Sequence, residues 1–334
     1  MLIIHVGTPK TGTKALQEHL RSNSDALLEQ GIRYVRAGRE KGRGTSHNDL
    51  ARAIRDRADD TVWDRLRNEL AKSTSRINVI SAEGLWLRDP AVLKSRLPDV
   101  EDLRIVVYLR RQDRYLQSLY MQTVSAGRPD DFAAWRKSVP DRGRYLDCVD
   151  DWAEAFGDEA IVIRPYERNG VADTVGDFSR LIGAEGLDVD REIHRNPSPR
   201  QELLQFIRAL NTLDLDVDEH RLFKALIARN TAYGRSCDLL TYEESAALLA
   251  NYAEDNRILI EEYYQDKSSP LFPELAPFEG PERWNPESEQ YHALTADVLD
   301  VLIDFVAGGL VSRKKAKGRK NPRNGREQRR RRRE

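Results

Sequence analysis

The sequence predicts an α/β fold with three layers, a central parallel sheet of about five strands and a helical C-terminal portion. Short apolar, β-branched segments alternate with segments of helical spacing from residue 2 to residue 182, and such alternation is typical of parallel, doubly wound sheets. Residues 186–311 show mainly helical patterns instead. A loop with two glycines, at residues 7–13, joins the first strand to the first helix.

The strands are predicted from runs of β-branched and other apolar residues. Residues 103–109 (Leu-Arg-Ile-Val-Val-Tyr-Leu) form the clearest central strand, and the full set is 2–6, 31–35, 76–81, 103–109 and 160–164. A helix is expected to begin near residue 46, with Ser46 or Asn48 as its cap. The other expected helices are 14–20, 64–73, 113–126, 175–182, 201–210, 221–229, 242–264 and 293–306.

Composition and charge indicate one domain with a tail. The chain has 54 Lys and Arg and 55 Asp and Glu, but residues 312–334 hold 13 of the former and 2 of the latter. The tail is therefore strongly basic, residues 1–311 are acidic, and we predict a single domain at 1–311 followed by a disordered tail. Two cysteines, no bilayer-length apolar run and no room for a signal peptide predict a soluble, cytoplasmic protein.

The glycine loop has the pattern of a phosphate-binding site. Gly7 and Gly12 are separated by four residues, as in nucleotide P-loops, and loop amides followed by a helix N-terminus favour an anion. A nucleotide-triphosphate P-loop continues with Lys and then Ser or Thr. Here Thr13 precedes Lys14, so the hydroxyl that would bind magnesium is absent from that position. The loop therefore predicts a P-loop-like phosphate cradle that works without a metal.

Polar residues follow several strands at the edge where parallel sheets bind ligands. Lys10 follows the first strand, Glu83 the third and Arg110 the fourth, and Ser118 lies eight residues after Arg110 on the next predicted helix. An arginine and a nearby hydroxyl can hold a second phosphate group. The pattern predicts a nucleotide with two separated phosphates.

These segments resemble sulfotransferases that use 3′-phosphoadenosine 5′-phosphosulfate (PAPS), in particular bacterial carbohydrate and glycolipid sulfotransferases. Residues 7–13 look like the family's 5′-phosphosulfate loop, residues 108–120 like its 3′-phosphate motif, and residues 163–167 like a weaker Tyr-Glu segment. The resemblance covers roughly residues 1–185 and, more loosely, 196–198. The sequence departs from the family pattern at Lys14 and at Arg111-Gln112.

The resemblance implies transfer of a sulfuryl group from PAPS to a hydroxyl of a carbohydrate, glycolipid or small-molecule acceptor, with 3′-phosphoadenosine 5′-phosphate (PAP) as product and no metal. Lys10 would stabilise charge on the departing phosphate, with the 5′-phosphate held by loop amides and hydroxyls and the 3′-phosphate by Arg110 and Ser118. The nucleotide-binding residues are then Pro9, Lys10, Thr11, Gly12, Thr13, Lys14, Arg110 and Ser118. The chemistry is electrostatic stabilisation with positioning.

An acceptor hydroxyl also needs a general base, and two residues compete for that role. Glu83 follows a buried strand at the same edge as the loop, and Ser81-Ala82-Glu83 resembles the strand-end glutamate of carbohydrate sulfotransferases. His47 is the alternative, because histidine is the usual base near neutral pH.

Two other functions remain open at this stage. A P-loop kinase would require magnesium and a Lys-Ser/Thr pair, whereas a nucleotide-binding scaffold would act through its basic tail. That tail also suits a polyanion or an anionic membrane surface, such as the inner face of the cytoplasmic membrane. It carries no aromatic residues for base stacking, so no specific nucleic acid is predicted.

Overall fold

The structure is a computed structural model, and it describes residues 1–40, 44–57, 60–166, 174–187, 201–212, 215–216, 238–266, 268–278, 298–299, 301 and 312–313. The chain divides into two compact units, which we describe separately. The first unit contains Met1–Gln122, Phe132–Ser198 and Ser236–Arg283, and the second contains Thr123–Asp131, Pro199–Arg235 and Trp284–Glu334.

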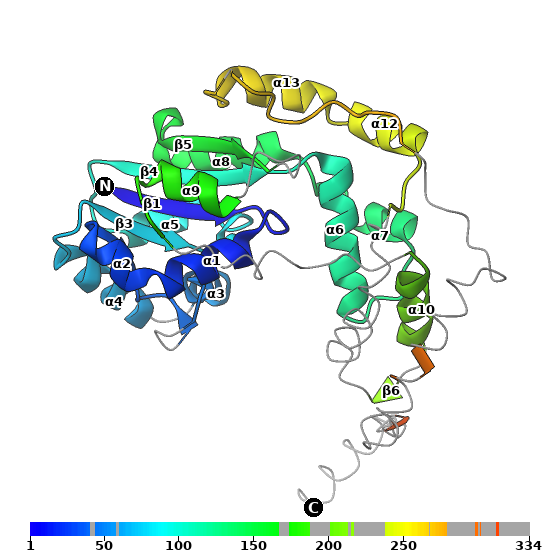
Figure 1. Cartoon of the computed structure of the whole chain (residues 1–334), viewed down its shortest axis with the longest axis horizontal. Coiled ribbons are helices and arrows are strands. Elements are labelled where there is room, and N and C mark those ends of the chain that lie inside the picture. The colour runs from blue at the N-terminus through cyan, green and yellow to red at the C-terminus, as the bar shows by residue number, and fades with distance from the viewer. Residues whose placement is uncertain are drawn as a thin grey trace, which may run out of the picture. The chain divides into compact units, whose positions relative to one another are not determined.

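The first unit is built on a parallel five-stranded sheet (Figure 1). Its strands are β1 (Leu2–Gly7), β2 (Ile32–Tyr34), β3 (Ile77–Ser81), β4 (Leu103–Leu109) and β5 (Ile161–Pro165), in the order β2-β3-β1-β4-β5. All four strand pairs are parallel, and Ile4 of β1 lies opposite Ile80 of β3 and Ile105 of β4. The predicted α/β class and the five predicted strands are confirmed.

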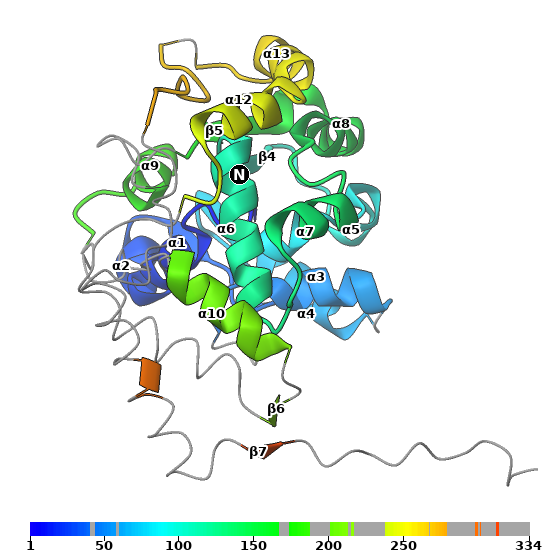
Figure 2. The same ribbon diagram turned by 90° about the vertical axis from the view of Figure 1, so that its right-hand side faces the viewer.

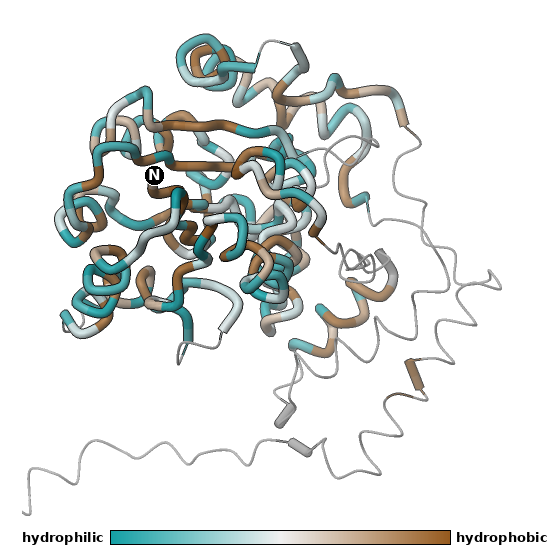
Figure 3. Tube along the Cα trace, turned by 60° about the vertical axis from the view of Figure 1, so that its left-hand side comes forward, coloured by the Kyte–Doolittle hydropathy of each residue, from teal (hydrophilic) through white to brown (hydrophobic). Residues whose placement is uncertain are grey.

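Helices cover both faces of this sheet (Figure 2). One face carries α1 (Thr13–Ser22), α2 (Ser24–Glu29) and α9 (Thr174–Leu181), and the other carries α5 (Pro90–Arg96) and α8 (Tyr145–Phe156). The central strands are hydrophobic along their length (Figure 3), because they are buried on both faces. The core under α1, α2 and α9 includes Ile3, Leu16, Leu20, Leu27, Val106, Tyr108, Val175 and Phe178.

Most of the predicted helices in the described part of the chain are present, with some corrections. The other helices of the first unit are α3 (Asn48–Asp56), α4 (Thr61–Ala71), η2 (Glu83–Leu85), α6 (Gln112–Ser125, which continues into the second unit), α7 (Phe132–Ser138), η3 (Asp158–Ala160), α12 (Tyr242–Ala250) and α13 (Ala253–Glu262). The single helix expected at 242–264 is wrong, since Asn251 ends α12 and Tyr252 precedes α13. The short helices α2, α5 and α7 and the longer helix α8 were not predicted.

The cap assigned to α3 is also wrong. His47 occupies the N-cap position without a side-chain hydrogen bond, and Asn48 is the first helical residue. The Asn48 side chain contacts Glu83 and Gly84 instead of its own helix. Asn48 therefore makes contacts with residues distant in the sequence and does not cap α3.

The second unit contains α10 (Gln201–Asn211) and a short antiparallel pair, β6 (Leu215–Asp216) with β7 (Ser312–Arg313). The Asn211 amide donates to the carbonyls of Val124 and Arg128. Ser312 and Arg313 are the first residues of the predicted tail. The helix predicted at 221–229, most of the one at 293–306 and the rest of the tail lie outside the described residues.

The boundary predicted at residue 311 is therefore not tested. In the described residues, no helix is both long and apolar enough to cross a membrane.

Candidate functional site

The sheet has a topological switch point between β1 and β4. From β1 the chain continues to β2 and β3 on one side, whereas β4 and β5 lie on the other side. Ligands of open parallel sheets bind beyond the carboxyl ends of the strands at such a point. The β1–α1 loop and Arg110 occupy these two strand ends.

The β1–α1 loop is fixed on β4 by buried hydrogen bonds. The backbone N–H and the hydroxyl of Thr8 both donate to the carbonyl of Tyr108, at 3.0 and 3.1 Å. The hydroxyl of Thr11 donates to the carbonyl of Thr8 at 2.6 Å and is completely buried. That proton is used inside the loop, so the structure does not support Thr11 as a hydroxyl donor to phosphate.

Gly12 ends the loop and begins α1. Its φ of 76° lies in the left-handed region, and a Cβ there would stand 3.1 Å from Oγ1 of Thr174. No side chain caps α1, and the first helical bond runs from the Leu16 N–H to the Gly12 carbonyl. The earlier amides of the first turn, beginning with buried Thr13, are therefore the orphan donors that bind anions at helix N-termini.

Two cations face this loop. The pKa of Lys10 is lowered by burial and, second, by the positive charge of Arg110. Among the described residues, no side chain forms an ion pair or hydrogen bond with the Lys10 ammonium. The Arg110 guanidinium lies over the Tyr166 ring, 5.5 Å from its centroid. A bound anion would offset the repulsion between Lys10 and Arg110. Lys14, the other lysine of this segment, is exposed.

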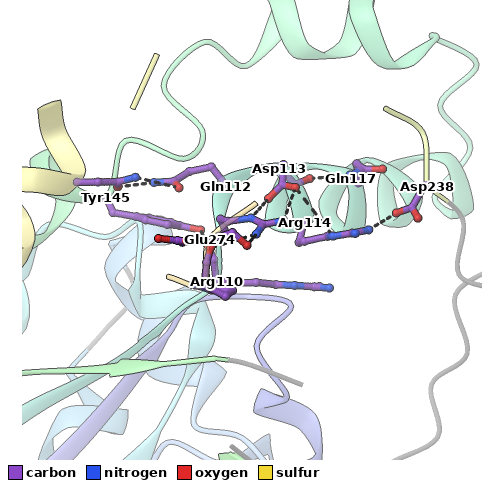
Figure 4. A network of polar contacts seen from close by, with 11 residues as sticks. Arg110, Gln112, Asp113, Arg114, Gln117, Tyr145, Asp238 and Glu274 are labelled. Carbon is purple, nitrogen blue, oxygen red and sulfur yellow. Dashed lines mark hydrogen bonds and ion pairs between the residues drawn. The ribbon is translucent and has the colours of Figure 1, made fainter. Parts of the chain in front are cut away.

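Arg111, next to Arg110, has a structural role in the polar network around Asp113. Asp113 and Glu274 of this network are shown in Figure 4. It pairs with both oxygens of Asp113, which is fully buried, and its Nη1 donates to the carbonyls of Pro273 and Glu274. Arg110 contributes its carbonyl to the surrounding network, as acceptor from the Tyr145 hydroxyl at 2.8 Å. The Arg110 side chain lies apart from Asp113 (Figure 4). Ser118 is half-buried on α6, which begins two residues after Arg110.

Glu83 lies beside the loop and is held by two amide donors. A Cβ on Gly7 would stand 3.4 Å from the Glu83 Cα. Gln17 of α1 donates to one Glu83 oxygen at 2.6 Å, and Asn48 of α3 donates to the other at 3.0 Å. Asn48 also accepts from the Gly84 N–H at 3.1 Å. These bonds fix the direction of the carboxylate.

His47 is engaged on both ring nitrogens by backbone groups. Nδ1 accepts from the Ser81 N–H at 3.1 Å, which assigns the proton to Nε2, and Nε2 donates to the Val35 carbonyl at 2.7 Å. The residue is completely buried, and burial lowers its pKa to about 4. In this arrangement no ring nitrogen of His47 is left to accept a proton from a substrate.

Gln17 and Asn48 were not identified from the sequence. Gln17 shares a face of α1 with Thr13 and Leu20, and all three are buried. A polar residue on a buried helix face needs a partner, and this was the signal available for Gln17. Asn48 looked like a helix cap, which concealed its contact with Glu83.

No known family model matches the sequence. An uncharacterized protein of Archaeoglobus fulgidus is 27% identical over 198 residues, 57% of this chain and 54% of that protein, so the match spans about half of the relative's length.

Among solved structures, a sulfotransferase from Alicyclobacillus acidocaldarius is similar over 70% of this chain and 98% of its own, with 18% identity and a TM-score of 0.36. The fold assignment rests on the sheet topology rather than on this similarity. Within the described ranges, no group of three or more His, Cys, Asp or Glu side chains has a metal-binding arrangement. The expectation of metal-free chemistry still depends on the loop sequence.

Proposed function

We propose that this protein is a sulfotransferase that moves a sulfuryl group from PAPS to an acceptor hydroxyl. The observation that carries the proposal is that two cations, Lys10 and Arg110, lie at the two strand ends of the switch point. The Glu83 carboxylate, held by two hydrogen bonds, lies beside the loop that carries Lys10. Two cations at neighbouring strand ends suit the two separated phosphates of PAPS. A carboxylate beside them supplies the base that an alcohol acceptor requires.

The residues would divide the work as follows. The α1 amides and Lys10 bind the 5′-phosphate, and Arg110 with Ser118 binds the 3′-phosphate. Glu83 accepts the proton of the acceptor hydroxyl while the acceptor oxygen bonds to sulfur and the bond between sulfur and the phosphate oxygen breaks. Lys10 then stabilises the negative charge left on that phosphate oxygen, which is the charge that develops in the transition state.

The loop sequence favours this function over phosphoryl transfer from a magnesium nucleotide. Lys14 occupies the position where a P-loop kinase has the metal-binding Ser or Thr. For the acceptor we propose a carbohydrate, a glycolipid or a small molecule with a free hydroxyl. The basic segment 312–334 would bring the enzyme, in the cytoplasm, to a polyanion or an anionic membrane surface.

The first test is calorimetric titration with PAP in the absence of magnesium, beside ATP with magnesium. We expect PAP to bind and Arg110→Ala to lose most of that affinity. Arg104→Ala is the matched control, because it removes the same charge from the opposite end of β4, where Arg104 is exposed and donates to the Glu159 carbonyl. Binding of ATP with magnesium but not of PAP would overturn the proposal.

A second variant tests the base. Glu83→Gln keeps a side chain of the same size, so we expect it to bind PAP as the wild type does and to lose turnover. If Glu83→Gln still transfers sulfuryl groups at the wild-type rate, Glu83 is not the base. Deletion of residues 314–334, which keeps β7, should leave turnover on a small soluble acceptor intact, whereas a scaffold that works through its tail would lose its function.

A further inference from the structure

Arg39 is a buried arginine that has no partner for its charge in the described part of the chain. Arg39 is 7% exposed, its Nε is buried without a hydrogen-bond partner, and no ion pair involves it in the described residues. Arg111 is equally buried, at 8%, and its guanidinium binds Asp113 and two backbone carbonyls. Buried charges are normally paired, so Arg39 is the exception that needs an explanation.

The surroundings of Arg39 favour an anion. Its guanidinium lies over the Tyr34 ring at 5.1 Å, a contact that orients the cation without neutralising it. The pKa of Arg39 is lowered, first by burial and also by the charges of Arg36 and Arg21. Glu69 raises that pKa but does not pair with Arg39, because its oxygens accept from the N–H groups of Arg36 and Ala37.

Arg39 belongs to the same loop cluster as Glu83. The Gly38 carbonyl, one residue before Arg39, accepts from the Asp49 N–H, one residue after Asn48. The Tyr34 ring beneath Arg39 meets the His47 ring edge-on at 4.9 Å. Asn48 follows His47 and donates to Glu83. The pKa of the Tyr34 phenol is raised, first by burial and also by the negative charge of Glu83.

We propose that Arg39 binds a carboxylate carried by the acceptor, side-on through Nε and one terminal nitrogen. This rests on the proposed function, since it makes the Arg39 cluster the acceptor side of the site. A guanidinium edge matches the two oxygens of a carboxylate, and the unpartnered Nε belongs to that edge. Residues 1–311 are acidic overall, but Arg36 and Arg21 add positive charge near Arg39, and the nearby Glu69 carboxylate is taken up by backbone N–H groups.

The test compares two sugars that differ in one group. Methyl β-glucuronide and methyl β-glucoside are titrated by saturation-transfer NMR, with and without PAP. We expect the wild type to bind the glucuronide at least tenfold more tightly than the glucoside. Arg39→Leu should lose this preference, Arg39→Lys should lose most of it because the planar fork is gone, and Arg36→Leu, an exposed neighbour of the same charge, should keep it.

Equal binding of the two sugars by the wild type, or a preference that persists in Arg39→Leu, would overturn the proposal. A preference that depends on Arg39 in a protein that fails to bind PAP would support the carboxylate site and reject sulfuryl transfer. Stability gives an independent readout, because removal of an unpaired buried charge should not destabilise the fold. We expect Arg39→Leu to match or exceed the wild-type urea midpoint. A fall as large as that of Arg111→Ala would show that Arg39 is structural.

Discussion

Two buried histidines should make the stability of this protein fall steeply in mild acid. His5 of β1 and His47 are completely buried, and burial is the main cause that lowers the pKa of each from 6.5 to about 4. In the unfolded chain both residues regain the ordinary value. Between pH 6.5 and about 4 the unfolded state therefore binds more protons than the folded state, and stability decreases as the pH falls.

The size of the effect follows from these values. For one histidine with a pKa of about 4 when folded and 6.5 when unfolded, linkage gives a loss of about 2 kcal/mol between pH 7 and pH 5. The two histidines together give about 4 kcal/mol, a large part of the stability of a typical domain. The pH 5 to 7 window lies above the range in which ordinary carboxylates titrate, so the histidines dominate it.

Urea unfolding at pH 7, 6 and 5 measures this dependence. His47→Gln cannot titrate and should reduce the pH slope by about half, while lowering stability at pH 7 because the bonds to Val35 and Ser81 are disturbed. His5→Asn should reduce the slope in the same way. An unchanged slope in His47→Gln would mean that His47 is charged, or exposed to water, in the folded protein. The argument that removes it from the catalytic candidates would then fail.

Two further substitutions separate structure from catalysis. Arg111→Ala should lower the unfolding free energy by about 3 kcal/mol, because it removes both hydrogen bonds to the buried Asp113 carboxylate and leaves it, among the described residues, only the Arg114 contact at 3.9 Å. Urea titration beside Arg104→Ala measures this, and a loss no greater than in Arg104→Ala would contradict it. Gln17→Leu removes a hydrogen-bond donor to Glu83. Because a hydrogen bond to a charged group contributes about 1.5–3 kcal/mol, we expect turnover to fall at least tenfold. The affinity for PAP should not change. An equal loss of PAP affinity would assign Gln17 to the loop instead of the base.

Four of the strands, β1, β3, β4 and β5, were predictable because each contains several β-branched residues that are buried in the structure, whereas β2 contains only Ile32. The missed helices had weaker but real signals. Asp89 caps α5 by accepting from the Ala91 N–H, and Pro90 begins the helix. An aspartate followed by a proline is a helix-start signal that can be recognised in the sequence. By contrast, the break between α12 and α13 has no proline or glycine, so tertiary packing and not local propensity decides it.

The sequence could predict which candidate site residues lie at the ends of the strands, but not which side chains they contact. Lys10, Glu83 and Arg110 meet at one edge because parallel strands end together, whereas side-chain partners depend on segments far away in sequence. Arg110 and Arg111 are adjacent and chemically identical, yet only Arg111 is captured by Asp113 and by the carbonyls near residue 273. From the sequence alone, a histidine at position 47 could be a helix cap, a general base or a structural residue that links backbone segments. The contacts with Val35 and Ser81 distinguish these roles, and they are visible only in the structure.

The chemistry of the donors around Glu83 gives a physical reason for the division of roles within the proposed mechanism. Gln17 and Asn48 are neutral, so they direct the carboxylate without pairing its charge. A lysine or arginine in either position would neutralise the base and withdraw a cation from the nucleotide. Among the described residues Lys10 forms no ion pair with Glu83, so in the proposed mechanism the Lys10 charge is left for the phosphate and the Glu83 charge for the acceptor proton. Exchanging Gln17 for Lys should therefore abolish turnover more completely than Gln17→Leu, although it preserves a hydrogen bond.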